Sequence, residues 1–197
     1  MTKSKIIMLV GAFFILALFV FPLWNITLEA PQYPDPIGMD IWINKITDHE
    51  PNDIQNINLM NHYVGMKNIP EDMKEFHVFP PIVIIMSVIG MVLAFVGNRK
   101  LYLTWFIVMV LLGTAGMYDF YLWEYDYGHN LSEHAAIKFT SPNGEPMAYQ
   151  PPLIGNKTIL NFVAKSWPTT GAYFLFTGIM LSLIAFFASK KEKQITS

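Results

Sequence analysis

Long apolar stretches separated by polar segments dominate the pattern of this chain. A helix needs about 20 mostly apolar residues to cross a bilayer core about 30 Å thick, at about 1.5 Å per residue. Four stretches meet that length: residues 6–24, 78–97, 101–123 and 168–188. Because unpaired backbone groups are costly in lipid, each stretch is expected to be helical. The pattern therefore predicts an all-α membrane protein with four transmembrane helices.

The first stretch has a second interpretation as a cleaved signal peptide, because Lys3 and Lys5 precede it. Its apolar run is longer than the roughly 7–15 apolar residues of a signal peptide. The nearest small residue after it, Ala30, is followed by Pro31, which is a poor context for cleavage. We therefore expect residues 6–24 to be retained as a membrane span.

Basic residues indicate how the spans are oriented. Lys and Arg near the end of a span resist translocation, so they mark the cytoplasmic side. If the spans alternate in direction, three basic clusters fall on one side: Lys3 and Lys5, Arg99 and Lys100, and Lys190, Lys191 and Lys193. The sequence thus predicts that both termini lie inside the cell (N-in/C-in) and that two acid-richer loops lie outside it.

This orientation divides the chain into five parts: the N-terminus with span one (1–24), outer loop one (25–77), spans two and three with a tight cytoplasmic turn (78–123), outer loop two (124–167), and span four with a basic tail (168–197). Both loops are longer than a connector needs to be. Each also contains aromatic and aliphatic residues, so we expect the two extracytoplasmic loops to form a small cap rather than stay disordered.

Composition supports a membrane location and excludes several kinds of chemistry. Charged residues are only 14% of the chain and hydrophobic residues 53%, and the formal net charge is −2, so nucleic acid is not an expected partner. Cysteine is absent. That absence excludes disulfides, thiolate metal ligands and the attachment of c-type haem.

Outer loop one shows two local helix signals. Residues 52–55 (Asn-Asp-Ile-Gln) resemble a capping box, and the apolar spacing that follows predicts a helix to Tyr63 or Val64, ended by Gly65. Pro70 with the acidic residues after it predicts a second short helix leading to span two. Pro80 and Pro81 are expected to kink or reset the junction with that span.

Methionine and histidine in outer loop one form a candidate metal site. In a helix, His62 and Met66 would share a face at i and i+4, and Met73 and His77 would do the same. Thioether and imidazole together suit Cu(I), so these residues and Met60 are candidate copper ligands. The alternative is that the methionines are ordinary apolar residues that pack the cap.

A second candidate cluster follows span three. Residues 119–134 combine carboxylates and aromatic side chains with His129 and His134. Spans two and three are expected to be antiparallel neighbours, which would bring His77 near His129. The alternative is an interfacial aromatic girdle with hydrated acids. Asp119, inside the third span, is either a functional group or a side chain that reaches the interface.

The sequence contains no catalytic motif of the kinds tested: G-x-S-x-G, H-E-x-x-H and the phosphate-binding loop are all absent. All five histidines lie in the outer loops, so none is available within a span to bind a transmembrane haem b. We therefore expect the protein not to be an enzyme.

Residues 123–131 (WEYDYGHNL), 135–138 (AAIK), 149–155 (YQPPLIG) and 61–66 (NHYVGM) carry a family resemblance. Together they resemble a small family of bacterial multi-pass membrane proteins encoded near nitrous oxide reductase and its copper-assembly factors. The resemblance implies a bacterial inner membrane location with loops facing the periplasm. It also implies an accessory role for a periplasmic copper enzyme, and it favours His62, Met66 and His129 over His49 as ligands. The absence of cysteine departs from the copper lipoprotein chaperones of such systems.

Three functions follow as hypotheses. The first is an accessory or assembly factor for a periplasmic copper enzyme, with Cu(I) held by Met60, His62, Met66, Met73, His77, His129 and His134. The second is a non-catalytic subunit that links a membrane electron-transfer chain to a periplasmic reductase. The third is a scaffold without a metal, whose aromatic and proline-rich loops grip a partner. The expected partners are the lipid bilayer and a periplasmic copper protein or other accessory membrane subunits.

Overall fold

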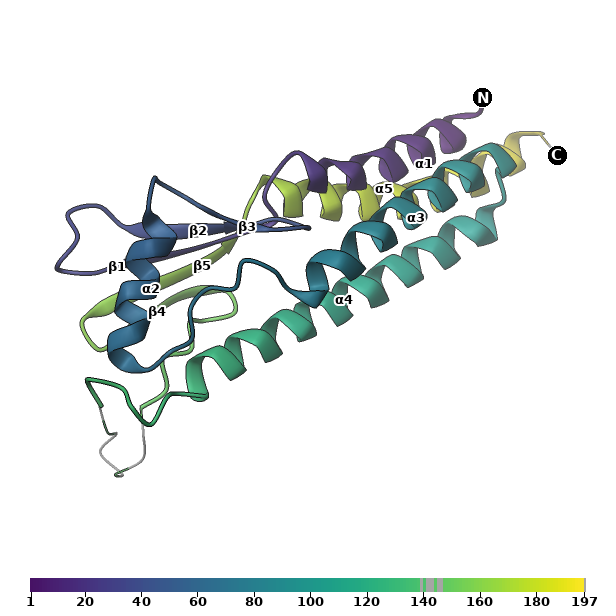
Figure 1. Cartoon of the computed structure of the whole chain (residues 1–197). Coiled ribbons are helices and arrows are strands. Elements are labelled where there is room, and N and C mark those ends of the chain that lie inside the picture. Colours follow the sequence, from purple (N-terminus) through teal and green to yellow (C-terminus); the bar gives the residue numbers. More distant parts are fainter. Residues whose placement is uncertain (139, 141–143, 145–146, 197) are drawn as a thin grey trace.

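The computed structural model describes residues 1–138, 140, 144 and 147–196. A bundle of helices forms one part of the molecule, and a sheet with one short helix forms the other (Figure 1). The N- and C-termini lie together at the end of the bundle that is farthest from the sheet. The chain therefore separates into an apolar bundle and what we call the sheet unit, residues 24–69 and 147–168.

Three helices of the described chain are long and apolar enough to cross a membrane. These are α3 (Lys74–Val96), α4 (Arg99–His129) and α5 (Thr170–Thr196). They correspond to the second, third and fourth predicted spans. A tight turn joins α3 to α4, where Gly97 adopts a left-handed conformation (φ 75°) and the Asn98 side chain accepts a hydrogen bond from Lys100 N. The composition and the structure together indicate a multi-pass membrane protein.

The prediction of the first span as one α-helix over residues 6–24 is wrong. Helix α1 covers only Lys3–Phe14, a 3-10 helix follows at Ile15–Phe19, and the chain is an extended strand from Trp24 onward. The 12-residue α-helix is about 18 Å long and the five-residue 3-10 helix adds about 10 Å, so no single α-helix of this stretch is long enough for a bilayer core of about 30 Å. Residues 6–24 are apolar throughout, but within them the backbone changes from an α-helix to a 3-10 helix and then to a strand.

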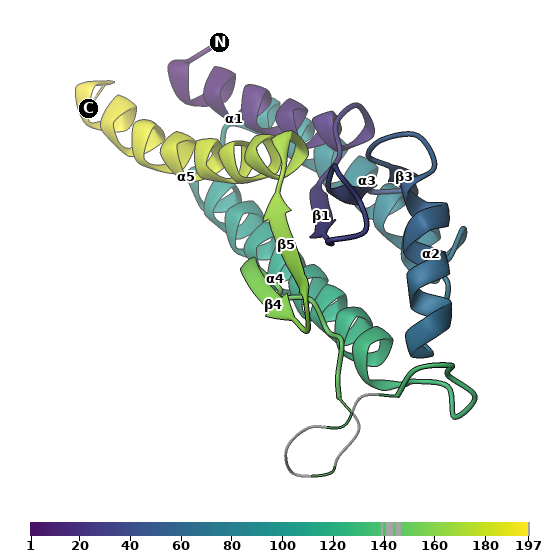
Figure 2. The same ribbon diagram turned by 90° about the vertical axis from the view of Figure 1, so that its left-hand side faces the viewer.

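The all-α prediction is also wrong, because the two expected loops contribute strands to one five-stranded antiparallel sheet. Its strands are β1 (Trp24–Glu29), β2 (Ile37–Ile41), β3 (Ile46–Asp48), β4 (Gly155–Ile159) and β5 (Phe162–Pro168), in the order β3-β2-β1-β5-β4. The central pair, β1 with β5, joins the two loops directly. Figure 2 shows β5 leading straight into α5. The predicted cap therefore exists as a packed unit, but it is built on strands.

The predicted helix in outer loop one is confirmed as α2 (Asp53–Val64), and Gly65 ends it with φ 81°. The predicted capping box does not form, because Asn52 is left-handed and its side chain makes no cap bond. Asp48 caps the helix instead, and Asp53 accepts from a residue outside the helix. Asp48 accepts from Ile54 N at 2.7 Å, and buried Asp53 accepts from Gly38 N at 2.8 Å, which ties the helix to β2.

The second predicted short helix, at Pro70, is wrong. Residues 68–73 are not helical, and α3 begins at Lys74. Pro80 and Pro81 lie inside α3, which continues through both of them as one helix. Proline removes an intrahelical hydrogen bond but does not always end a helix.

Close approach of α1 to α5 depends on two glycines. A Cβ atom added to Gly11 would lie 2.8 Å from Gly178 O, and one added to Gly178 would lie 2.7 Å from Gly11 O.

Hydrogen bonds between side chains and backbone add to the packing of the bundle. Ser87 Oγ donates to Ala12 O at 2.8 Å, and Trp105 Nε1 donates to Met86 O at 2.9 Å.

Candidate functional site

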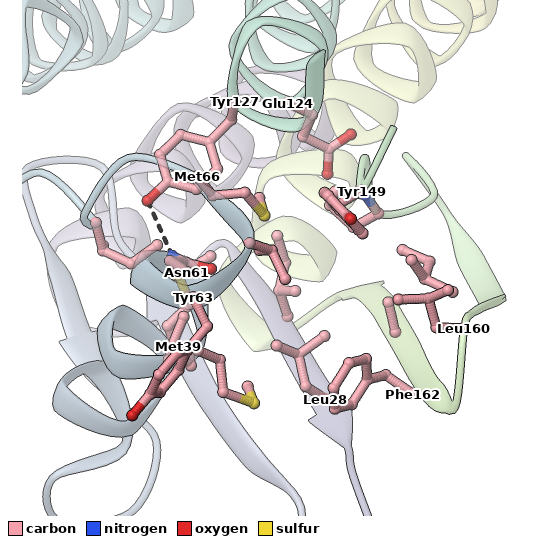
Figure 3. Close-up of a pocket in the computed structure, with 18 of the residues that line it drawn as sticks. Leu28, Met39, Asn61, Tyr63, Met66, Glu124, Tyr127, Tyr149, Leu160 and Phe162 are labelled. Carbon is pink, nitrogen blue, oxygen red and sulfur yellow. Dashed lines mark hydrogen bonds between the residues drawn. The ribbon is translucent and has the colours of Figure 1, made fainter. Parts of the chain in front are cut away.

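A cavity of about 340 Å³ lies within the sheet unit, between the sheet, α2, the last turns of α4 and the segment around Tyr149. Most side chains around it are aliphatic, aromatic or thioether groups, as Figure 3 shows. Its volume falls in the range of about 300–1,000 Å³ that is usual for small-molecule sites. The cavity is therefore the candidate site of this protein.

The regular repeat of side-chain directions along each strand and helix decides which residues face the cavity. In β1, Ile26 and Leu28 line it, and in β5 Phe162 and Ala164 do, as expected for alternating positions of a strand. In α2, Ile57, Met60, Asn61 and Val64 line it, and these positions share one helical face. The sheet and α2 therefore form opposing apolar walls.

Glu124 of α4 is the unusual member of the lining. Its side chain is 0% exposed, and neither carboxylate oxygen has a hydrogen-bond partner among the described residues. In Figure 3 its carboxyl group points from α4 toward Tyr149. A buried carboxyl without a partner is far less costly in the neutral, protonated form than as an ion. Glu124 therefore gives the cavity a buried polar group whose hydrogen-bonding capacity is unused among the described residues.

Gly128, one helical turn after Glu124, lets the segment around Tyr149 close the cavity. Tyr149 N donates to Gly128 O at 2.9 Å. A Cβ atom added to Gly128 would lie only 2.4 Å from the backbone N and Cα of Gln150. A residue with a side chain at position 128 would push this segment away from α4, so glycine is required for the close approach that covers Glu124.

The other buried polar side chains nearby are bonded to one another. Asn61 Nδ2 donates to the Tyr127 hydroxyl at 3.2 Å and to Lys67 O at 3.1 Å, and the Tyr127 hydroxyl donates to the same carbonyl of Lys67 (Figure 3 marks the Asn61 to Tyr127 bond). Lys67 Nζ also lies 2.6 Å from Asp126 Oδ2. This network holds the end of α2 against α4 and leaves Tyr127 satisfied.

The two predicted ligand pairs at i and i+4 do not share a helix. Met66 follows Gly65, where the left-handed backbone ends α2, and so Met66 is outside the helix that carries His62. Met73 is the extended residue before α3, with φ −136°, and so it is outside the helix that carries His77. In each case a helix boundary falls between the two residues, and the predicted geometry is wrong.

The structure separates the predicted methionine ligands from the predicted histidine ligands. Met60 and Met66 line the cavity, as does Met39, which the sequence analysis did not single out. His62 and His134 are exposed. His77 is exposed and pairs with Asp72 at 2.8 Å, and its hydrogen bond holds the pKa of Asp72 below its usual value. The described residues contain no group of three or more His, Asp or Glu side chains placed to hold a metal.

His129 and Asp119 lie outside the cavity as well. The ring of exposed His129 stacks on Tyr125 at 4.0 Å, and its Nδ1 lies 2.9 Å from Tyr125 O. Asp119 is partly exposed on α4 and is not among the residues that line the cavity.

Sequence reasoning did not single out Glu124, because it took the acids after Trp123 together, either as part of a candidate cation site or as hydrated interfacial residues. The second interpretation fits Asp126, which is exposed, but not Glu124. The available signal was helical spacing. Trp123, Tyr127 and Glu124 lie on neighbouring positions of consecutive turns, so the face that buries the two aromatic residues also carries Glu124.

Comparison with known proteins does not assign the chain to a family. No family model matches the sequence, and no curated protein matches it significantly. The link to nitrous oxide reductase accessory proteins therefore stays a prediction from resemblance, and the function has to be argued from the cavity.

Proposed function

We propose that the chain is a membrane-anchored, non-enzymatic binding protein that takes up a ligand in the cavity beside Glu124. The observation that carries this proposal is the fully buried carboxyl group of Glu124, which has no hydrogen-bond partner among the described residues and lines a mostly apolar cavity. Leaving such a group unsatisfied costs about 1–3 kcal/mol. Proteins keep costly groups of this kind chiefly at functional sites, where stability is exchanged for activity.

The anchored location is the second part of the proposal. The basic residues Lys3, Lys5, Arg99 and Lys100 belong to the end of the bundle that is farthest from the sheet unit (Figure 1). The excess of basic residues on the cytoplasmic side of membrane proteins supports an orientation with the sheet unit outside the cell. In a bacterium, the sheet unit would then stand in the periplasm on the inner membrane.

Photolabelling tests ligand uptake directly. The apolar, carbonyl-free reagent 3-trifluoromethyl-3-phenyldiazirine would be activated in the presence of the purified protein in lipid nanodiscs. Labelled peptides would then be mapped by mass spectrometry. The expected result is saturable labelling of Met39, Met66 or Leu28 in the cavity. Non-saturable labelling of the exposed Phe95 on α3 serves as the internal control that the reagent reached the bilayer.

Labelling confined to residues of α3, α4 and α5 that do not line the cavity would contradict the proposal, because it would show that the cavity excludes apolar molecules. A matched variant strengthens the test. Ala164 is 0% exposed and faces the cavity from β5, so Ala164→Leu should fill part of the space and reduce the saturable labelling. Ala164→Ser adds almost no volume and should leave the labelling unchanged.

A second candidate function is support of a periplasmic copper enzyme, as an accessory or assembly factor. The observation that favours it is the presence of three thioethers, Met39, Met60 and Met66, around one cavity, since thioethers prefer Cu(I). Figure 3 places Met66 near Glu124 and Tyr127, but Met39 at the opposite end near Leu28 and Phe162. Met66 and Met39 therefore lie at different ends of the cavity.

Copper titration separates this candidate from the first. If the methionines bind Cu(I), leucine at positions 39, 60 and 66 should lower the affinity at least tenfold. Alanine at His62, His77 and His129 should matter only if the histidines take part. Equal affinity in the wild type and the triple leucine variant would contradict copper binding in the cavity. A metal-free scaffold linking membrane and periplasmic subunits would then be the remaining accessory role.

A further inference from the structure

We propose that the ligand is a neutral, mostly apolar compound whose carbonyl oxygen accepts a hydrogen bond from the protonated carboxyl of Glu124. This inference rests on the proposed function and specifies the chemical class of the ligand. Its structural basis is the position of one unpartnered carboxyl group at the Tyr127 and Tyr149 end of an apolar cavity.

The first step concerns what Glu124 offers. A protonated carboxyl group has one O–H donor, and here both of its oxygens are buried without a hydrogen-bond partner in the described chain. A ligand that carries an acceptor would satisfy this donor. A pure hydrocarbon would fill the same space but leave the donor unsatisfied, at a cost of about 1–3 kcal/mol.

The second step excludes the neighbouring polar groups as the principal contact. Tyr127 already donates to Lys67 O and accepts from Asn61. The amide nitrogen of Asn61 in turn donates to both the Tyr127 hydroxyl and Lys67 O. Among the buried side-chain atoms that line the cavity in the described residues, only the Glu124 oxygens are unpartnered. A polar atom of the ligand would therefore gain most at Glu124.

The third step favours a neutral ligand over a cation. A cation would require Glu124 to ionise in a buried, apolar setting, and a buried ion pair recovers its desolvation cost only when further hydrogen bonds satisfy both partners. The surroundings do not supply such bonds to the carboxylate. The basic residue with an electrostatic effect on Glu124 is Lys157, but it is exposed and its Nζ donates to Gln150 O at 3.0 Å.

The fourth step gives the ligand a direction. Rings gather near Glu124, where Trp123 and Tyr127 lie 5.2 Å apart between centroids and Tyr149 stands opposite (Figure 3). The other end of the cavity is formed by Leu28, Met39 and Phe162. A planar carbonyl-bearing group would therefore lie at the Glu124 end, with any aliphatic part directed toward Leu28.

The test compares two compounds of nearly equal shape, 9-fluorenone and fluorene, as competitors of the diazirine labelling described above. The full-length wild type would be measured beside Glu124→Gln and Glu124→Leu in lipid nanodiscs. Glutamine keeps a neutral N–H donor at this position, whereas leucine keeps only the volume. In the wild type, fluorenone should compete about tenfold better than fluorene, which corresponds to about 1.4 kcal/mol.

The variants decide the role of Glu124. Glu124→Gln should retain the preference for fluorenone, and Glu124→Leu should remove it while fluorene still competes. Equal competition by both compounds in the wild type would overturn the inference, although binding in the cavity would still stand. Loss of the preference in Glu124→Gln would overturn the neutral-donor role. Absence of any cavity labelling would refute the proposed function itself.

Discussion

The indole Nε1 of Trp24 donates a 2.7 Å hydrogen bond to the hydroxyl of Ser166, across a separation of 142 positions in the sequence. Trp24 begins β1 and Ser166 lies in β5, so this bond connects the two segments that form the sheet unit. Both residues are buried. The bond therefore fixes the part of the sheet nearest the helical bundle.

Ser166→Ala should lower the free energy of unfolding by about 1–3 kcal/mol, because it leaves the buried indole N–H without its acceptor. The midpoint of thermal unfolding in detergent measures the effect. Asn156→Ala is the matched control. Asn156 also accepts a bond from a Trp Nε1 of β5, that of Trp167, but the pair is exposed. Its loss should change stability by less than about 0.5 kcal/mol, and equal effects of the two substitutions would contradict the buried position of Trp24.

Gly178→Ala should destabilise the bundle by about 1–3 kcal/mol, because its Cβ would overlap the backbone of α1 at Gly11. Gly113→Ala on α4 is the control. A Cβ there meets nothing within 4 Å, and alanine is the better helix former by about 1 kcal/mol. Thermal unfolding should therefore shift downward for position 178 and stay level or shift upward for position 113. A downward shift of the same size for both would show that α1 and α5 do not approach each other closely.

Three of the four predicted spans are long helices, because a long run of apolar residues, as in α3, α4 and α5, has one structural solution in lipid. The helix α2 was predictable from local spacing and Gly65. The sheet was harder, since β1 pairs with β5 through contacts between distant residues that no local pattern reveals. Trp24, Ile26 and Leu28 do alternate with polar residues, but the apolar run before them concealed the start of that alternation.

The site was predicted only in part. Met60 and Met66 were selected for their chemistry and do line the cavity. The expected pairs, His62 with Met66 and Met73 with His77, each required one continuous helix, but α2 ends before Met66 and α3 begins after Met73. Leu160 gave no turn signal, yet it adopts φ 58° between β4 and β5 and lines the same cavity. Left-handed backbone costs an ordinary residue roughly 1–2 kcal/mol, so only the packed sheet explains its position.

Gly128→Ala should open the cavity. The added Cβ meets the backbone of Gln150 rather than a flexible side chain, so the segment around Tyr149 has to move away from α4. Saturable diazirine labelling of Met66 should fall several-fold. Gly116→Ala, on the same helix with nothing within 4 Å of its Cβ, should leave the labelling unchanged. Unaltered labelling in Gly128→Ala would contradict the role of the Tyr149 segment in closing the cavity.

Glu124→Leu should raise stability while removing the preference for carbonyl compounds. Leucine has a similar volume, and it replaces an unsatisfied buried carboxyl, so a gain of about 1–3 kcal/mol is expected in thermal unfolding without ligand. Glu133→Leu changes an exposed glutamate and should have an effect of less than about 0.5 kcal/mol. Strong destabilisation by Glu124→Leu would mean that the carboxyl group has a structural partner.

Native mass spectrometry of the protein extracted from its own membrane tests ligand uptake beside Glu124 most directly. The wild type is expected to carry a small organic molecule that contains a carbonyl oxygen, is released intact on activation, and is depleted in both Ala164→Leu and Glu124→Leu. Ala164→Ser should carry it at the wild-type level. Wild-type protein without such a molecule, or with an adduct retained equally in all three variants, would contradict the account.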